Sequence, residues 1–261
     1  KPIIEAGFQW PMGIAVNDAG TVYVGDGMFA YTISPGGTKQ AAGSLFGGNF
    51  PGFMRGVASS GADGWLVTTA NSAVARWTPG SEPEYVATGF DRLMGVAETP
   101  GGAVAFADYD TGRLMLAEKG EVRELANGLD KPMGVAVAAD GTVYVAESGA
   151  GRVSKISGGK AESVIDGLGE PQGIAVAGGK LYVLDVAAKE VIECDLASGA
   201  QRSIAGRLPV GSPPGVIAKP LGGVGDMCGP MTAFAGLAAG ADGSLYLSGD
   251  AEGSVLALKA G

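Results

Sequence analysis

The chain of 261 residues contains no histidine. Histidine is the side chain whose ordinary pKa lies nearest to neutral pH, so a serine triad would lack its usual general base here. Cysteine is also scarce, since Cys194 and Cys228 are 34 positions apart and form no Cys-x-x-Cys motif. A disulfide and two buried thiols are both compatible with this spacing, so the sequence leaves open whether the two cysteines pair.

Charged residues make up only 17% of the chain, and acidic residues outnumber basic ones by 27 to 18. The net charge of −9 repels phosphate backbones, so we expect no nucleic-acid partner. No apolar run reaches the roughly 18 residues of a membrane span, so we expect no membrane insertion. The chain begins at Lys1 without a leader segment, which we interpret as a processed chain or a part of a longer protein, fused to or paired with another domain.

Glycine, by contrast, is abundant, with 47 residues, and hydrophobic residues reach 46%. Glycine weakens helices but supports tight turns, and this hydrophobic fraction is ample for one sizeable core. The composition therefore favours many short strands over long helices. We expect an all-β fold in a single domain that spans residues 1–261.

One short segment recurs six times along the chain, with a central glycine that is followed by Ile, Val or Leu and then by Ala. The six central glycines are Gly13, Gly56, Gly95, Gly134, Gly173 and Gly236. They are 43, 39, 39, 39 and 63 residues apart, close to the roughly 40–50 residues of a propeller blade except at an insertion over about residues 207–231. A solenoid would need polar capping repeats, and none is visible.

Each copy is followed by a glycine-containing turn and a run rich in Val, Tyr and Leu, which predicts a β-hairpin. Two further strand-like stretches follow, for example at 152–156 and 162–165, so each repeat predicts a four-stranded antiparallel unit. The last repeat ends after three such stretches, and Pro2 to Gly7 resembles the missing fourth. We therefore predict a six-bladed β-propeller that the N-terminal strand closes by completing the last blade, with Ile3 and Ile4 beside Leu256.

In such a fold, the residue before each repeat glycine lies at one mouth of the central channel, close to the end of the second strand. Loops from all blades converge there, so this mouth is the expected functional site. The residues before the glycines are mostly soft and apolar: Met12, Arg55, Met94, Met133, Gln172 and Ala235. The residues that close the second strands are mostly acidic: Asp26, Thr69, Asp108, Glu147, Asp185 and, one position further on, Asp250.

The apolar set has two main interpretations. Either the methionines plug the channel as adaptable packing residues, or they form a pliable ligand pocket. In the second case the ligand-binding residues are Arg55, Met12, Met94, Met133, Gln172, Trp10, Phe53 and Phe234. Arg55 would grip a carboxylate of the ligand, or else form a salt bridge to Asp26 or Asp108. Capture of a soft metal by thioethers together with Cys228 is a weaker third interpretation.

The acidic set also has two interpretations. Each carboxylate either caps a turn and binds backbone amides, or contributes to an electronegative rim. In the second case an oxygen-rich site for a divalent cation, with Ca²⁺ as the fitting ion, can be built from Asp26, Asp108, Glu147 and Asp185. Asp108 and Asp185 are then the candidate catalytic carboxylates.

The pattern Pro-x-Gly-Ile/Val-Ala-Val, followed by Val-Tyr-Val-x-Asp/Glu, resembles the NHL-repeat family of six-bladed propellers, which is related to the gluconolactonase-like propellers. Residues 225–233 (GDMCGPMTA) are similar to the Gly-Asp-Gly-Gly-Pro-Ala-Thr-Ala stretch of bacterial NHL proteins. The resemblance covers the whole chain and implies the fold. Its relatives include lactone hydrolases, lyases and receptor sensor domains, so it does not imply one function.

Two consequences of the resemblance concern chemistry. Lyases of the virginiamycin and amidating types rely on histidine, so the resemblance excludes their chemistry for a chain without histidine. Gluconolactonases hold a divalent cation through Glu, Asn and Asp, where this chain has Pro11 or Met12, Met133 and Gln172. That metal site therefore does not carry over residue by residue.

Two functions from different classes remain. The first is a binding module that needs no cofactor, a monomeric propeller in an extracytoplasmic (periplasmic or secreted) location, with a small molecule or peptide at the channel mouth. The alternative is a metal-assisted lactone or ester hydrolase that uses the rim carboxylates. Saturable binding without turnover is expected from the first, and activity that a chelator removes from the second.

Overall fold

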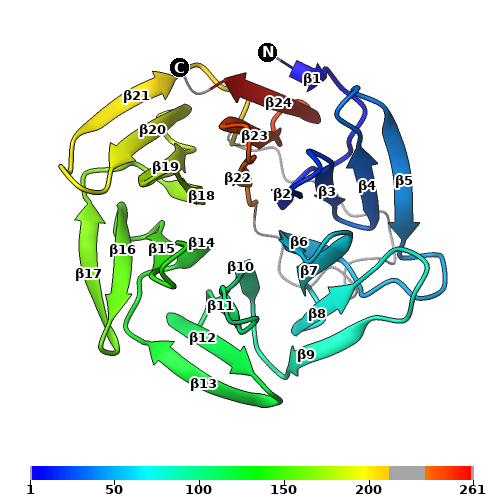
Figure 1. Ribbon diagram of the computed structural model, residues 1–261, viewed down its shortest axis with the longest axis horizontal. Helices are drawn as coiled ribbons and strands as arrows, with labels where there is room; N and C mark the ends of the chain where they lie inside the picture. The colour runs from blue at the N-terminus through cyan, green and yellow to red at the C-terminus, as the bar shows by residue number, and fades with distance from the viewer. Residues whose placement is uncertain (1, 212–232, 260–261) are drawn as a thin grey trace.

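The structure is a computed structural model that describes residues 2–211 and 233–259 (Figure 1). These residues form six four-stranded antiparallel sheets arranged around one axis, which we number as blades 1 to 6. The predicted six-bladed β-propeller is therefore confirmed. The insertion predicted over about residues 207–231 lies mostly outside the described residues.

Within each blade the strands follow one another from the axis outward. Blade 1 contains β2 (Ile14–Val16), β3 (Val22–Asp26), β4 (Phe29–Ile33) and β5 (Lys39–Ser44), and blade 2 contains β6 (Met54–Ser60), β7 (Gly64–Thr69), β8 (Ala73–Trp77) and β9 (Glu84–Thr88). Blade 3 contains β10 (Leu93–Glu98), β11 (Val104–Asp108), β12 (Arg113–Glu118) and β13 (Glu121–Ala126), and blade 4 contains β14 (Pro132–Val137), β15 (Val143–Glu147), β16 (Arg152–Ser157) and β17 (Lys160–Ile165). Blade 5 contains β18 (Pro171–Ala177), β19 (Lys180–Asp185), β20 (Glu190–Asp195) and β21 (Gln201–Ala205), and blade 6 contains β22 (Leu237–Ala239), β23 (Ser244–Gly249), β24 (Ser254–Lys259) and β1 (Pro2–Ile4).

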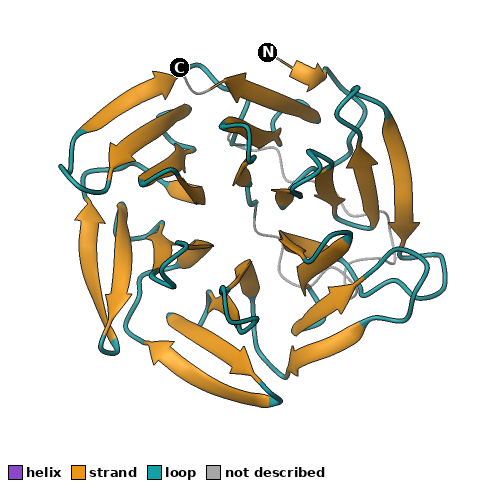
Figure 2. Cartoon of the chain, viewed as in Figure 1, coloured by secondary structure: helices purple, strands orange, loops and turns teal. Residues whose placement is uncertain are grey.

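The character of the strands changes from the axis to the rim. The second strand β15 is buried along its whole length, because both of its faces pack against neighbouring blades. The outer strand β13 is exposed over its first four residues. Figure 2 shows strands and loops but no helix in the described part of the chain. Accordingly, no helix there is long and apolar enough to cross a membrane.

The closure of the ring follows the sequence prediction. Strand β1 pairs antiparallel with β24, with Pro2 opposite Leu256 and Ile4 opposite Val255. Figure 1 shows β1 beside β24 at the outer edge of blade 6. The first strand of the chain thus completes the last blade, which removes the free edge that three strands would leave.

The repeat glycines have a packing role on the axis. A Cβ on Gly13 would overlap the backbone of Arg55 and Val57, and a Cβ on Gly134 would overlap the carbonyl oxygen of Gln172. Each glycine therefore lets the inner strand of its blade approach the inner strand of the next one. This close contact explains why glycine is kept in all six copies while the flanking residues vary.

The cysteine question is answered for one of the two residues. Cys194 lies in β20, is fully buried and is a free thiol. Burial raises the pKa of the Cys194 thiol, and the nearby Asp195 carboxylate adds to this effect. Cys228 lies outside the described residues.

Candidate functional site

The axial channel is nearly filled by its own walls. A cavity of about 30 Å³ lies on the axis, lined by five of the six repeat glycines, by Phe234 and by one aliphatic residue from each blade. These aliphatic residues are Ile14, Val57, Val96, Val135, Ile174 and Leu237. The cavity has room for no more than a few water molecules.

The residues before the repeat glycines form the floor of the mouth where the inner strands begin. All six are buried: Met12, Arg55, Met94, Met133, Gln172 and Ala235. The three methionines belong to one apolar cluster with Phe53 and Phe234, and Trp10 packs against that cluster. The structure thus brings the predicted apolar residues together, in the arrangement expected of a plug. Direct contact of these residues with a ligand stays a prediction.

The two polar members of this floor bind neighbouring blades. The guanidinium group of Arg55 donates a hydrogen bond to the carbonyl oxygen of Leu93 at 3.5 Å, which links blade 2 to blade 3. The side-chain oxygen of Gln172 accepts from the backbone N–H of Ala235 at 2.7 Å, and its amide nitrogen donates to Glu170 at 3.0 Å. Both hydrogen-bonding ends of the Gln172 amide are therefore in use within the protein.

Most of the acidic ring binds backbone amides. Asp185 accepts hydrogen bonds from the N–H groups of Gly169 at 2.7 Å, Glu170 at 3.0 Å and Ala188 at 3.2 Å. Asp26 accepts from the N–H groups of Gln9 and Trp10. In both blades the carboxylate holds the loop that enters the inner strand, which is the turn-capping interpretation of this ring.

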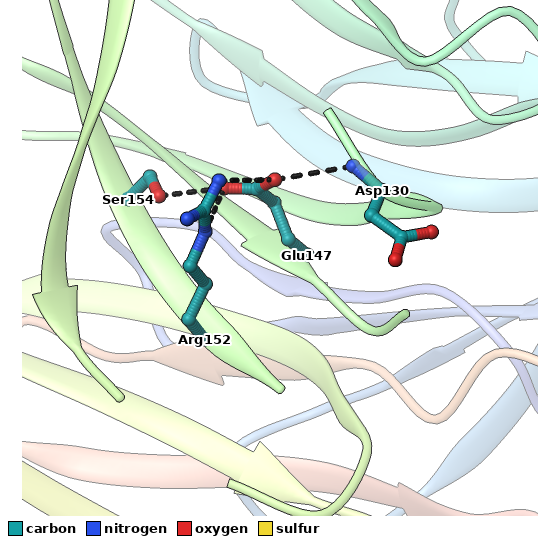
Figure 3. Close-up of polar contacts among 4 residues, drawn as sticks. All are labelled: Asp130, Glu147, Arg152 and Ser154. Carbon is teal, nitrogen blue, oxygen red and sulfur yellow. Dashed lines mark hydrogen bonds and ion pairs between the residues drawn. The ribbon is translucent and has the colours of Figure 1, made fainter. Parts of the chain in front are cut away.

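Glu147 is held by the largest number of donors (Figure 3). Arg152 binds both carboxylate oxygens at 2.7 and 3.0 Å, Ser154 donates at 2.6 Å, and the N–H of Asp130 donates at 3.1 Å. Burial raises the pKa of the Glu147 carboxyl, but these hydrogen bonds outweigh burial and leave the pKa below its ordinary value. Glu147 is thus an ionised structural group.

The pKa values of Asp26 and Asp250 are shifted upward, opposite to that of Glu147. Burial raises the pKa of the Asp26 carboxyl, and the hydrogen bonds from Gln9 and Trp10 offset burial only in part. Burial likewise raises the pKa of Asp250, whose Oδ1 accepts a hydrogen bond from the N–H of Gly211 at 2.9 Å. The acidic ring is therefore not a uniform set of free negative charges.

Asp108 and Asp250 depart from this pattern, because one carboxylate oxygen of each, Oδ1 of Asp108 and Oδ2 of Asp250, is buried without a hydrogen-bond partner. The other oxygen of Asp108, Oδ2, binds Arg113 at 2.8 Å. The indole N–H of Trp10 is also buried and without a partner. Asp108 lies opposite Leu93 at the start of β10, and Trp10 precedes β2, so both atoms lie at the same mouth. Buried polar atoms are rarely left unpaired, so these two atoms call for an explanation.

Three residues at the mouth were missed from the sequence. Met28, Ala70 and Tyr109 are half-buried and pack against the cluster that contains the methionines. Each follows the acidic-ring position of its blade by one or two residues, a regular spacing that could have identified them. The guanidinium group of Arg92 lies over the Tyr109 ring at 5.0 Å and also pairs with Asp110 at 3.3 Å. Blades 1 to 3 therefore supply a half-exposed wall above the buried floor.

The structure does not bring the predicted calcium ligands together. Over residues 2–211 and 233–259, no three His, Cys, Asp or Glu side chains are placed to hold a metal ion. Each of the four carboxylates belongs to a different blade: Asp26, Asp108, Glu147 and Asp185. Of the two candidate catalytic residues, Asp185 has both oxygens occupied by amides, and only Asp108 keeps an oxygen available. Divalent-cation binding stays a prediction for experiment.

Comparison with known proteins supports the fold. No family model and no curated protein matches the chain, so the NHL likeness stays a resemblance. A gluconolactonase from Xanthomonas campestris is similar in structure, with a TM-score of 0.72 and 14% identity, over 99% of this chain and 88% of that one. A chain of the nidogen/laminin complex has a TM-score of 0.64 and 20% identity, over 73% of this chain and 78% of its own.

A third similar structure is that of a lyase. It is a catalytically inactive histidine-to-alanine variant of virginiamycin B lyase from Staphylococcus aureus, with a TM-score of 0.62 and 18% identity, over 91% of this chain and 77% of that one. The present chain has no histidine at any position. At these identities the three structures establish a shared propeller architecture and no more.

Proposed function

We propose that the protein is a binding module that takes a small, uncharged polar ligand, or the polar tip of a larger one, at the channel mouth over blades 1 to 3. The observation that carries this proposal is the pair of unpartnered buried polar atoms, the indole N–H of Trp10 and Oδ1 of Asp108. One is a donor and the other an acceptor. A ligand with hydroxyl, amide or lactone groups satisfies both kinds of atom.

The surroundings of these two atoms suit such a ligand. Trp10 packs edge-to-face on Phe53, with ring centroids 6.0 Å apart, and the buried methionines lie beneath. An apolar floor with a few directed polar atoms is the usual composition of a small-molecule site. The carboxylates of Asp26 and Asp185 accept hydrogen bonds within the protein, so they offer few free oxygens to coordinate a cation. The net charge of −9 disfavours a polyanionic ligand.

Tryptophan fluorescence provides the test. Trp65 and Trp77 are only 1% and 3% exposed, whereas Trp10 is half-buried at the mouth. Titration with a panel of monosaccharides, aldonolactones and small amides is therefore expected to change the emission of Trp10 in a saturable way. In the Trp10→Phe variant this change is lost, and affinity measured by calorimetry falls about fivefold for one missing neutral hydrogen bond.

Two variants make the test specific. Asp108→Asn presents an amide in place of the carboxylate and is expected to weaken binding about ten- to hundredfold. Trp77→Phe is the matched control, because the indole of Trp77 donates to the carbonyl oxygen of Asn49 away from the mouth, and it should leave affinity unchanged. Equal affinity of the wild type, Trp10→Phe and Asp108→Asn for every bound compound would show that the mouth is not the site.

A lactone or ester hydrolase is the second candidate. The structural similarity to a gluconolactonase and the available oxygen of Asp108 favour it. In that case the Asp108 carboxylate would accept a proton from an attacking water, with a divalent cation as the group that polarises the lactone. Turnover of an aldonolactone that disappears in Asp108→Asn and on chelation supports the hydrolase, whereas binding without turnover supports the module.

The cellular setting is part of the same proposal. We place the protein outside the cytoplasm as a monomeric propeller, alone or joined to another domain. Cell fractionation tests the location, and light scattering of the purified chain tests the oligomeric state. A cytoplasmic or stably dimeric protein would contradict these two parts without touching the argument about the mouth.

A further inference from the structure

The connection between blades 1 and 2 is longer than the three connections that join blades 2 to 5. Nine residues, 45–53, separate β5 from β6, whereas four separate β9 from β10 and five separate β13 from β14 and β17 from β18. Strand β5 ends at the rim beside blade 2, so the connection begins there (Figure 1). No Asp, Glu, Lys or Arg occurs from Gln40 to Met54, and the connection includes Phe46, Phe50 and Phe53. The connection is therefore uncharged and rich in aromatic side chains.

Contacts with both adjoining blades hold this connection in place. The indole N–H of Trp77 in blade 2 donates to the carbonyl oxygen of Asn49 at 2.7 Å, and the Phe50 ring packs edge-on against Trp77 with centroids 5.4 Å apart. At the start of the connection, the N–H of Leu45 donates to the carbonyl oxygen of Met28 in blade 1 at 2.8 Å. The backbone is thus fixed before any ligand binds, which lowers the entropy cost of binding.

Two aromatic side chains of this region are exposed to solvent. Phe46 is 68% exposed, and Tyr85 on the outer strand β9 is 54% exposed. Among the described residues, the only other exposed large hydrophobic side chain is Val122. The hydroxyl of Tyr85 donates to the carbonyl oxygen of Pro51 at 3.5 Å, so both aromatic residues adjoin the same connection. We call Phe46, residues 47–51 and Tyr85 the rim platform.

The two rings of the rim platform are within reach of one extended ligand. Phe46 and Pro51 are five positions apart, so their Cα atoms are at most about 18 Å apart. The Phe46 ring contacts the Phe29 ring, with centroids 6.3 Å apart and an angle of 56° between the planes. Residues 47–49 (Gly-Gly-Asn) are exposed and offer backbone groups and one primary amide. The platform thus combines aromatic surface with neutral hydrogen-bonding groups.

The size of the aromatic surface argues against a folded protein as the partner. An aromatic side chain presents roughly 200 Å², so the exposed fractions of Phe46 and Tyr85 together amount to about 240 Å². Each partner of a stable protein complex buries about 800 Å². A second copy of this chain or another folded protein would therefore find too little apolar area here, whereas a narrow linear ligand needs less.

We propose that the rim platform binds an uncharged polysaccharide of β-1,4-linked glucose units. In this linkage the glucose ring carries its hydroxyls around the edge and C–H groups on both flat faces, so one sugar stacks on Phe46 and another on Tyr85. The hydroxyls at the edge pair with the exposed backbone and amide groups of residues 47–49. An anionic polysaccharide is disfavoured, because the exposed Glu84 adjoins Tyr85 and residues 40–54 contain no cation.

The experiment titrates the full chain with three sugars by calorimetry. Cellohexaose is long enough to cover both rings and is expected to bind most tightly. Cellobiose can cover only one ring and should bind about two- to tenfold more weakly, the range of one aromatic stacking contact. The β-1,4-linked hexamer of glucuronic acid has the same linkage but a carboxylate on every ring, and it should bind more weakly than cellohexaose.

Protein variants test the two rings separately. Phe46→Ala and Tyr85→Ala should each weaken cellohexaose binding about two- to tenfold, and the double variant should weaken it further. Tyr85→Phe keeps the ring and loses only the hydrogen bond to Pro51, so its affinity should stay close to that of the wild type. Val122→Ala is the matched control, because Val122 is an exposed hydrophobic residue on the outer strand of blade 3. Both aromatic side chains are exposed, so the urea midpoint of unfolding should be the same in all variants.

Three results would overturn the proposal. They are equal affinity of the wild type and the double variant for cellohexaose, tighter binding of the glucuronic acid hexamer than of cellohexaose, and no binding of cellohexaose at millimolar concentration. Hexaproline with both termini blocked is titrated as well, because aromatic surfaces also bind proline-rich peptides. Tighter binding of hexaproline than of cellohexaose would overturn the choice of a polysaccharide.

The rim platform and the channel mouth are distinguished by a further pair of variants. Trp10→Phe and Asp108→Asn are titrated with cellohexaose. Unchanged affinity in these two variants supports the rim platform, whatever the outcome of the tests at the mouth. Loss of affinity in either variant would place the sugar at the channel mouth and overturn the assignment.

Discussion

The carboxylate of Glu147 offers the sharpest test of the structural role assigned to the acidic ring. Glu147→Gln removes the charge and turns one acceptor oxygen into a donor. Ser154 and the N–H of Asp130 bind different oxygens, so one of these two donors loses its acceptor at a buried position. An unsatisfied buried donor costs about 1–3 kcal/mol. Arg152 is 34% exposed and regains water, so the loss of its ion pair adds only about 1 kcal/mol. We expect the free energy of unfolding to fall by about 2–4 kcal/mol at neutral pH.

The effect of Glu147→Gln should depend on pH with a definite sign. The folded state holds the pKa of Glu147 below the ordinary value of 4.5, so the unfolded state takes up the proton first as pH falls. The stabilisation is therefore complete above that ordinary value and is lost as pH falls through the lower pKa of the folded state. The difference between wild type and variant is expected to be constant at neutral pH and to shrink in strongly acidic solution.

Urea unfolding of both proteins at several pH values measures this difference. Glu162→Gln is the control, because Glu162 is an exposed residue of the same blade that pairs with Lys155 at 3.0 Å, and its cost should stay within about 0.5 kcal/mol. A double-mutant cycle with Arg152→Gln should give a coupling energy of about 0.5–1 kcal/mol. A cost of Glu147→Gln no larger than that of the control would refute the structural interpretation and return this carboxylate to the list of possible ligand contacts.

Three further predictions concern the ring, the axis and the thiol. The carboxyl carbon of Asp26 should titrate by NMR above its ordinary value and that of Glu147 below it, so the contribution of Asp26 to stability is lost as pH rises through its raised pKa. Gly134→Ala should cost at least about 2 kcal/mol in urea unfolding, because the Cβ meets the carbonyl of Gln172, whereas Gly206→Ala, with open space around it, should be nearly neutral. The buried thiol of Cys194 should react with a thiol reagent only after denaturation, and rapid reaction of the native protein at this residue would contradict its burial.

The propeller could be predicted from the sequence because each blade is a local object. The hairpin turns and the repeat glycines are separated by short, regular intervals, so the unit can be recognised without long-range information. The closure of the ring could also be predicted, because the sequence of β1 resembles that of the outermost strand of an ordinary blade. The partner of β1 is more than 250 positions away, yet the pairing of Pro2 with Leu256 follows from counting strands.

The candidate site could be located but not understood from the sequence. The positions of Met12, Met94 and Met133 at the mouth follow from the repeat, but their complete burial depends on the narrowness of the ring, which the repeat does not express. The hydrogen-bond donors that bind the acidic ring could not be predicted from the sequence either. From the sequence alone, a carboxylate at the end of β19 could face solvent or accept hydrogen bonds from backbone N–H groups. The path of the loop that enters the inner strand decides which of the two occurs, and in the structure three N–H groups are bound.

We propose the side of the mouth over blades 1 to 3 as the ligand site because its residues depart from the repeat. A position filled in the same way in every blade has a role that the ring itself requires, as the glycines and the amide-binding carboxylates do. In blade 2 the acidic position is Thr69, in blade 3 Asp108 keeps one oxygen unpaired, and in blade 1 the indole of Trp10 has no acceptor. All three tryptophans of the chain, moreover, lie at or before position 77, within the first two blades and the segment that leads into them. We propose that these exceptions serve a ligand rather than the scaffold, although blade 6 carries one of its own in Oδ2 of Asp250. The Trp10→Phe variant should therefore fold with nearly wild-type stability while losing affinity at the mouth. Asp108→Asn should lose affinity too, but it also places an amide N–H₂ at a buried position without an acceptor and should cost about 1–3 kcal/mol of stability.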